Sequence, residues 1–253
     1  KRGRNMKIFA NIPTFFKAYG NLPQLTQFKK EIEKAKVAGD LEREKEYILK
    51  ATSTWGKSLS KSIGMDLELL GGENLPKNGP VVYMSNHQSF ADIVALCAVL
   101  DTIQFGFIAK DKLDRVPLYG SWINRIRSVM INRDNAREGL KAISKGISFI
   151  NDGFSLLIFP EGKRSQCPDM GEFKAGAMKI ATKPGVPIIP ISLDGTWRIF
   201  EEKGRLQKGL VKIKIHPPID TKNLSREEEK HLSREVYDII HSGVLELQRH
   251  SEN

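Results

Sequence analysis

The stretch Asn86-His87-Gln88-Ser89-Phe90-Ala91-Asp92 separates two short apolar segments. Residues 81–84 before it read Val-Val-Tyr-Met, which is typical of a buried strand, and residues 93–100 are apolar enough for a largely buried helix. Side chains five positions apart point in different directions on a straight helix, so His87 and Asp92 can meet only if His87 precedes the helix. The sequence therefore predicts a strand-to-helix junction, with a helix that begins near Ser89.

Two interpretations of Asp92 are open at this point. In the first, the carboxylate fixes the tautomer of His87, so that a neutral imidazole, whose ordinary pKa is about 6.5, can take a proton from a hydroxyl group. In the second, Ser89 and Asp92 form the S-x-x-D pattern of a capping box, and Asp92 only binds backbone NH groups at the start of the helix. The spacing fits both a catalytic pair and a helix cap.

The chain after residue 63 alternates between strand-like and helix-like segments. The predicted strands are residues 66–70, 81–84, 103–109, 128–131, 154–159, 187–193 and 211–215. The predicted helices are residues 93–100, 118–126, 136–150, 173–182 and 225–248. This pattern predicts an α/β domain over residues 64–253, with a mixed sheet flanked by helices and a site at the carboxyl ends of strands. Prolines at positions 187 and 190 place the strand 187–193 at a sheet edge or at a bulge.

Residues 1–63 are predicted to form a basic helical region, with Gly39-Asp40 between two helices and Gly64 after the second. The first 30 residues contain seven Lys or Arg and no acidic residue. Apolar residues recur there at helical intervals, with an interruption at Pro13: Ile8, Phe9, Ile12, Phe15, Phe16 and Tyr19. Such a segment is typical of a helix in the headgroup layer of an anionic membrane. A helix packed against the domain, with its basic face in water, fits the same pattern.

Composition disfavours several classes of protein. Nucleic-acid binding is not expected, because the basic segment lacks a helix-turn-helix pattern or an aromatic platform. Cys97 and Cys167 have no C-x-x-C or metal-ligand spacing, which favours a reduced, cytosolic environment and predicts no metal site. No apolar run reaches the roughly 18–20 residues of a spanning helix. The sequence begins at Lys1 rather than at Met, which leaves a membrane anchor before it open.

Basic residues follow several of the predicted strands. Lys110 follows one strand and Arg133 the next, and the segment Pro160-Glu161-Gly162-Lys163-Arg164-Ser165 follows a third. A glycine beside Lys and Arg lets backbone NH groups and cations converge on a phosphate. Any single cluster is also explained by a solvated loop. Several clusters at the same end of a sheet predict a phosphate-bearing substrate.

The paired motifs H-x4-D at residues 87–92 and F-P-E-G-K-R-S at residues 159–165 resemble those of the glycerolipid acyltransferase family, specifically the 1-acylglycerol-3-phosphate acyltransferases. Residues 110–120 with Arg133, and residues 186–190, resemble the two weaker motif blocks of that family. The resemblance implies transfer of an acyl group from acyl-CoA or acyl carrier protein to the sn-2 hydroxyl of lysophosphatidic acid. The product would be phosphatidic acid, and no cofactor besides the acyl thioester co-substrate is implied.

The resemblance also implies roles for individual residues. His87 would deprotonate the sn-2 hydroxyl and Asp92 would orient His87, so activity should fall as the pH drops through about 6.5. Glu161 is associated with glycerol binding or loop order, and Gly162 with a close backbone approach. The implied phosphate- and glycerol-binding residues are Lys110, Arg133, Glu161, Gly162, Arg164 and Ser165.

Two residues depart from the family pattern, because Lys163 stands where Thr is usual and Lys112 where Glu is frequent. Other functions stay open: an acyltransferase for glycerol 3-phosphate or another lysophospholipid, a lipid or thioester hydrolase with a Ser/His/Asp triad, and a non-catalytic membrane scaffold. The expected location is the cytoplasmic face of a bacterial inner membrane, with monotopic attachment.

Overall fold

A computed structural model describes residues 25–111, 113, 119–131 and 136–249 of the chain. Three predicted features lie outside these residues: the N-terminal segment with the apolar positions 8–19, Lys112 and Arg133. The described part begins with a hairpin of two helices, α3 (Thr26–Ala38) and α4 (Leu41–Ile63). Gly39 and Gly64, both at positive φ (69° and 76°), end the two helices, so the predicted helix break and helix end are confirmed.

The described strands form one seven-stranded sheet. They are β1 (Met65–Leu70), β2 (Val82–Ser85), β3 (Phe105–Lys110), β4 (Val129–Ile131), β5 (Ser155–Ile158), β6 (Ile188–Asp194) and β7 (Gly209–Ile215). Their order is β1-β7-β6-β2-β5-β3-β4. Strands β6 and β7 are antiparallel and the other neighbours are parallel, so the predicted mixed sheet is confirmed.

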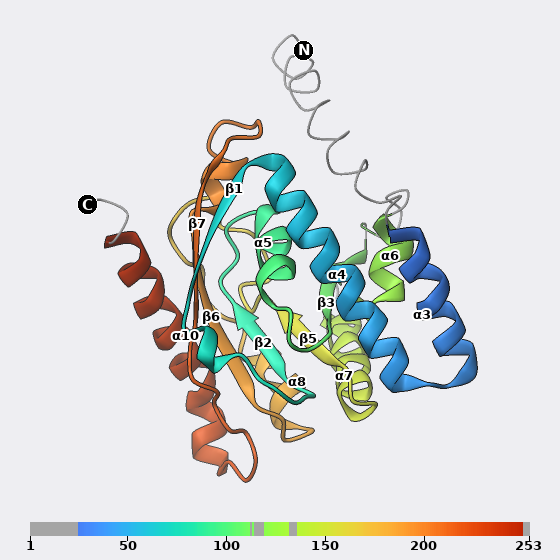
Figure 1. Cartoon of the computed structure of the whole chain (residues 1–253). Coiled ribbons are helices and arrows are strands. Elements are labelled where there is room, and N and C mark those ends of the chain that lie inside the picture. Colours follow the sequence, from blue (N-terminus) through green and yellow to red (C-terminus); the bar gives the residue numbers. More distant parts are fainter. Residues whose placement is uncertain (1–24, 112, 114–118, 132–135, 250–253) are drawn as a thin grey trace.

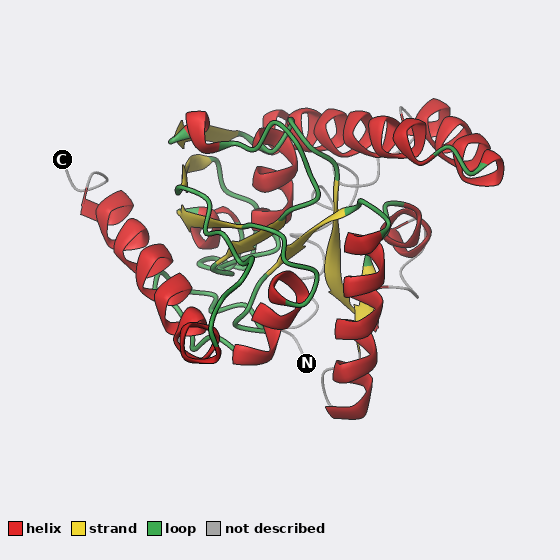
Figure 2. Cartoon of the chain, turned by 90° about the horizontal axis from the view of Figure 1, so that it is seen from below, coloured by secondary structure: helices red, strands yellow, loops and turns green. Residues whose placement is uncertain are grey.

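Helices cover both faces of this sheet (Figures 1 and 2). Helices α4 and α5 (Ala91–Val99) lie on one face, and α7 (Ala136–Asn151), α8 (Lys179–Thr182) and α10 (Arg226–Arg249) lie on the other. The remaining short elements are η2 (Gly72–Asn74), α6 (Tyr119–Arg125), η4 (Ala175–Met178) and α9 (Thr196–Ile199).

The side chains of β2 contribute to the hydrophobic cores on both faces of the sheet. Because successive strand residues point to opposite faces, Tyr83 joins the core under α4 and α5, whereas Val82 and Met84 join the core under α8 and α10. All three side chains are fully buried. The sheet therefore has a hydrophobic core on each face, and the His87 motif begins directly after β2, at its carboxyl end.

Two local predictions differ from the structure. The helix predicted over residues 173–182 is confirmed only in its last four residues, which form α8, because the turn before them is the 3-10 helix η4. Just before η4, the chain is drawn towards the preceding loop by hydrogen bonds from Gly171 N to Glu161 Oε2 (2.8 Å) and from Lys174 N to Pro160 O (3.0 Å). Long-range hydrogen bonds of this kind compete with helix formation.

The expected edge position of residues 187–193 is wrong, because β6 lies between β7 and β2. A bulge does occur beside β6, but its extra residue lies on the opposing segment of residues 215–219. Between the pair Ile191–Ile215 and the bridge Ile188–Ile219, three steps along one chain segment oppose four along the other. Pro190, which cannot donate a hydrogen bond, lies within this irregular stretch, and its carbonyl accepts from His216 N (3.0 Å).

Candidate active site

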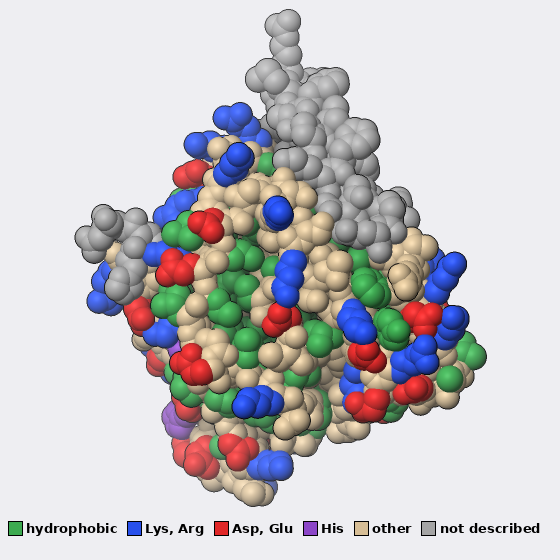
Figure 3. All heavy atoms as spheres, viewed as in Figure 1, with side chains coloured by type: hydrophobic (Ala, Val, Ile, Leu, Met, Phe, Trp, Pro, Cys, Tyr) green, Lys and Arg blue, Asp and Glu red, His purple; other side chains and the backbone are tan. Residues whose placement is uncertain are grey.

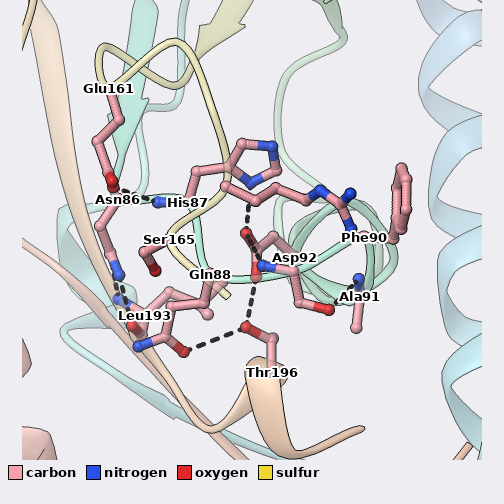
Figure 4. A network of polar contacts seen from close by, with 12 residues as sticks. Asn86, His87, Gln88, Phe90, Ala91, Asp92, Glu161, Ser165, Leu193 and Thr196 are labelled. Atoms are coloured by element: carbon pink, nitrogen blue, oxygen red, sulfur yellow. Dashed lines mark hydrogen bonds and ion pairs between the residues drawn. The ribbon is translucent and has the colours of Figure 1, made fainter. Parts of the chain in front are cut away.

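His87 and Asp92 meet at the carboxyl end of β2. Helix α5 begins at Ala91, so His87 precedes the helix as the spacing predicts. The Nδ1 atom of His87 lies 2.6 Å from Asp92 Oδ2, and Figure 4 shows the second ring nitrogen facing away from Asp92. An ionised Asp92 accepts from Nδ1–H and therefore leaves the lone pair of Nε2 exposed at the site. This arrangement suits a general base.

Asp92 also caps the helix, so the two interpretations of its role are not exclusive. Its Oδ2 atom accepts a hydrogen bond from Ser89 N at 3.0 Å, which is half of a capping box. Its Oδ1 atom accepts from the hydroxyl group of Thr196, the first residue of α9. With both oxygens bound and the side chain fully buried, the carboxylate has one fixed orientation towards His87.

The residues on either side of His87 attach the motif to the end of β6. Asn86 exchanges two hydrogen bonds with the backbone of Leu193, from Nδ2 to Leu193 O (2.8 Å) and from Leu193 N to Oδ1 (2.9 Å). Gln88 Oε1 accepts from Gly195 N at 3.2 Å and lies 3.2 Å from the Thr196 hydroxyl oxygen, whose one hydrogen is donated to Asp92 Oδ1. Figure 4 shows these side chains pointing to the side opposite the imidazole ring. The backbone of His87 is thus fixed from β6, more than 100 positions away.

The loop that follows β5 packs against the backbone of His87. Ser165 N donates to His87 O at 2.8 Å, and His87 N donates to Glu161 Oε1 at 2.7 Å. The aromatic ring of Phe159 stacks on the imidazole, with centroids 4.0 Å apart. The two sequence motifs therefore build one site.

Both carboxylate oxygens of Glu161 accept backbone hydrogen bonds, from His87 N and Gly171 N. Burial raises the pKa of Glu161, while these two NH groups act in the opposite direction. In this structure the carboxylate holds the loop, which is one of the two roles that the family resemblance implies. Gly162 has φ 72°, and a Cβ there would lie 3.0 Å from the end of the Lys174 side chain.

Arg164 lies at the rim of the site. Its Nη1 atom contacts Glu201 Oε1 at 2.7 Å, and its guanidinium carbon lies 3.6 Å from the centre of the Phe90 ring. Lys110 is the exposed last residue of β3. Ser165 contributes its backbone NH to His87 and donates its hydroxyl to Cys167 O. The structure thus brings Glu161, Arg164 and Ser165 together with His87.

Three residues that sequence reasoning missed complete the site: Asn86, Thr196 and Glu201. Asn86 is the first residue of the stretch 86–92, but no sequence pattern indicates its partner Leu193 on β6. Thr196 and Glu201 lie after β6, and the Asp194-Gly195-Thr196 turn at the end of a buried strand was the available signal. Their partners are 104 and 112 positions away in the sequence, a separation that no local pattern records.

Neither Ser85 nor Ser89 is placed as a nucleophile. Ser89 Oγ donates to Glu201 and accepts from Ala91 N at 3.0 Å, and Ser85 is fully buried at the end of β2. Among the described residues, no serine hydroxyl is hydrogen-bonded to His87. In the same residues, no group of three metal-ligating side chains occurs, and no helix has the length and hydropathy needed to cross a membrane.

Comparison with known proteins agrees with this geometry. The family model described as Acyltransferase matches residues 66–194, which include both motifs. The 1-acyl-sn-glycerol-3-phosphate acyltransferase of Borreliella burgdorferi is 33% identical over 178 residues, which are 70% of this chain and 71% of that protein. The chloroplastic 1-acyl-sn-glycerol-3-phosphate acyltransferase BAT2 of Brassica napus is 37% identical over 155 residues, which are 60% of this chain.

The chain spans less than half of that chloroplastic relative, 44% of its length. Among solved structures, the crystal structure of the 1-acyl-sn-glycerophosphate (LPA) acyltransferase PlsC from Thermotoga maritima superposes with a TM-score of 0.72. The sequence identity is 30%, and the match covers 92% of this chain and 98% of the other. By its sequence, its fold and both motifs, the chain belongs to the acyltransferase family.

Proposed function

We propose that this protein transfers an acyl group from an acyl thioester to the sn-2 hydroxyl of lysophosphatidic acid, giving phosphatidic acid. The observation that carries the proposal is the His87–Asp92 pair, with Nδ1 bound at 2.6 Å and the other ring nitrogen facing outward. The relatives named as 1-acyl-sn-glycerol-3-phosphate acyltransferases support the choice of acceptor.

The chemistry needs a base, not a nucleophilic side chain. His87 Nε2 takes the proton of the sn-2 hydroxyl, and the oxygen attacks the thioester carbon. The new C–O bond forms, the C–S bond breaks, and the departing sulfur takes the proton from the imidazolium. Asp92 stabilises the imidazolium between these steps, because its buried carboxylate is held beside Nδ1.

The acceptor's phosphate requires cations beside His87. Arg164 supplies one on the rim of the site. Lys110 is the exposed last residue of β3, and Lys163 and Lys174 are exposed side chains on the segment that follows β5. A guanidinium binds phosphate through parallel N–H donors, whereas ammonium groups act as point charges. We assign the principal phosphate contact to Arg164 for this reason.

Both substrates carry acyl chains and need apolar surface near the site. Figure 3 shows hydrophobic side chains gathered in the middle of the face on which Figure 1 draws β1, α5 and α4. On these elements, Leu69 is 39% exposed, and Trp55 and Leu67 are only partly buried. We propose that this face meets the bilayer at the cytoplasmic side, together with the basic N-terminal segment.

The deciding experiment follows phosphatidic acid by mass spectrometry, with acyl-CoA or acyl carrier protein thioester as donor. Product is expected only when lysophosphatidic acid and a thioester are both present. Release of free fatty acid without lysophosphatidic acid would instead identify a hydrolase. Glycerol 3-phosphate and other lysophospholipids serve as competing acceptors, and faster acylation of one of them would change the assigned substrate.

Membrane attachment has its own test. Removal of residues 1–24 deletes five of the seven basic residues in the first 30, together with the apolar positions between residues 8 and 19, but keeps α3, α4 and the sheet. The truncated protein should sediment less than the full chain with vesicles that contain anionic lipid. With neutral vesicles, both proteins should sediment to the same small extent. Unchanged sedimentation with anionic vesicles would refute the role of this segment.

A further inference from the structure

Glu201 joins the two sequence motifs of the site, although it belongs to neither. It follows α9 in the connection between β6 and β7. Its side chain is only 4% exposed. It accepts hydrogen bonds from the Ser89 hydroxyl, from Phe90 N (3.4 Å) and from Arg164 Nη1 (2.7 Å). One buried carboxylate therefore links the start of α5 to the loop after β5.

The contact with Glu201 leaves Arg164 partly open to solvent. The Arg164 side chain is 26% exposed, so it is more accessible than its partner. A guanidinium has five N–H donors, and the contact to Glu201 is through Nη1. The Phe90 ring lies 3.6 Å below the guanidinium carbon and is itself 56% exposed. An ion pair on one side and a ring on one face hold the guanidinium plane, while its other donors stay available.

We propose that Glu201 is a positioning residue for the acceptor substrate, because it holds the Arg164 guanidinium in the orientation that binds the phosphate group. This inference rests on the proposed function, in which Arg164 contacts that phosphate. Glu201 does not touch the substrate, since its oxygens are bound and its side chain is buried. An arginine that is fixed before binding loses less side-chain entropy when the phosphate arrives, which strengthens binding.

The test substitution is Glu201→Gln, which keeps the shape and an acceptor for Ser89 but removes the charge that holds Arg164. The KM for lysophosphatidic acid should rise about tenfold, because a charged hydrogen bond contributes about that factor in binding. The KM for the acyl thioester, the kcat and the thermal unfolding midpoint should change little. Glu202→Gln is the matched control, since Glu202 is the exposed neighbouring carboxylate, and it should leave all four quantities unchanged.

Two other results would overturn the proposal. A lower KM for lysophosphatidic acid in Glu201→Gln would mean that Glu201 competes with the phosphate for Arg164. A fall in kcat and in the unfolding midpoint at unchanged KM would mean that Glu201 only stabilises the loops. The double variant with Arg164→Gln sharpens the test, because the loss from Glu201→Gln should largely disappear when Arg164 is already absent.

A binding measurement separates this inference from the proposed function. In the His87→Ala background turnover is expected to fall about 1,000-fold or more, and without a thioester binding of lysophosphatidic acid can be compared by calorimetry with that of monoacylglycerol, which lacks the phosphate. Glu201→Gln should weaken binding of the first lipid about tenfold and leave the second unchanged. Equal losses for both lipids would refute the positioning role, even if the acyltransferase activity is found. Selective loss without any acyl transfer by the wild type would refute only the proposed function.

Discussion

Among the residues that the structure describes, His87 and His216 are buried and hydrogen-bonded, but only His87 has the geometry of a candidate base. His87 is 9% exposed and His216 is 8% exposed, and their ring nitrogens lie 2.6 and 2.7 Å from their partners. The partner of His87 is the carboxylate of Asp92. The partner of His216 is the hydroxyl group of Ser192 on β6.

The surroundings of His216 hold it neutral. Ser192 donates its hydroxyl to Ile240 O of α10 at 2.7 Å, so His216 Nε2 acts as the donor to Ser192. The contact is tight, since a Cβ on Gly243 would lie 2.2 Å from Ser192 Oγ. Burial, with a smaller effect of Lys214, lowers the pKa of His216 to about 4, while Glu246 acts in the opposite direction. A buried histidine that is paired with a hydroxyl group, such as His216, therefore has a structural role. A histidine that is paired with a buried carboxylate and has its other ring nitrogen facing outward, such as His87, is a candidate base.

The largest difference between the two histidines is expected when each is replaced separately by alanine. His87→Ala should reduce kcat for acyl transfer by about 1,000-fold or more, because it removes the base. His216→Ala should keep the activity within a few-fold but lower the free energy of unfolding by about 2 kcal/mol, since it deletes a buried, hydrogen-bonded ring. The measurements are phosphatidic acid formation and urea unfolding. A large activity loss in His216→Ala at unchanged stability would contradict the assigned roles.

Asp92→Asn replaces the carboxylate that pairs with His87 by a neutral amide, whose oxygen can still accept a hydrogen bond from Ser89 N. The kcat should fall by roughly 100-fold or more, because the amide no longer stabilises the imidazolium. The helical circular dichroism should be preserved, which shows that the start of α5 survives. A rate close to that of the wild type would reduce Asp92 to a helix cap.

Thr196→Val tests the support behind the pair. The valine keeps the branched shape but removes the hydroxyl that donates to Asp92, and the loss of one hydrogen bond to a charged group predicts a fall in kcat of about tenfold. Thr196→Ser keeps the hydroxyl and should retain most of the activity. Equal losses in both variants would mean that packing, not the hydrogen bond, matters at this position.

The two histidines also differ in their expected effect on the pH dependence of stability. In the unfolded chain His216 takes up a proton near its ordinary pKa of about 6.5, whereas in the folded protein it does so only near pH 4. The unfolded state thus binds more protons between these values, and stability falls as the pH drops from 7 to 5, by up to about 2 kcal/mol. His216→Gln lacks this contribution. Urea midpoints at the two pH values should fall more in the wild type, and equal falls would contradict the shifted pKa.

Local sequence patterns predict much of the fold. Each predicted strand corresponds to a strand of the sheet, and the five-residue spacing placed His87 before the helix. Of the helix predicted over residues 173–182, only α8 is α-helical, because hydrogen bonds from Gly171 N to the Glu161 carboxylate and from Lys174 N to Pro160 O hold the chain before it. The four-residue α9 was missed because one turn leaves no measurable period.

The alternation of elements, the strand-to-helix junction and the two motifs follow from the sequence, because periodicity and spacing are local properties of the chain. The tertiary fold was needed to place β6 in the middle of the sheet, with Thr196 and the anchor for Asn86 at its carboxyl end. It also decided that Glu201 joins Arg164 to the start of α5. These contacts link residues that are distant in the sequence, and only the packing of the sheet and its loops brings their atoms within hydrogen-bonding distance.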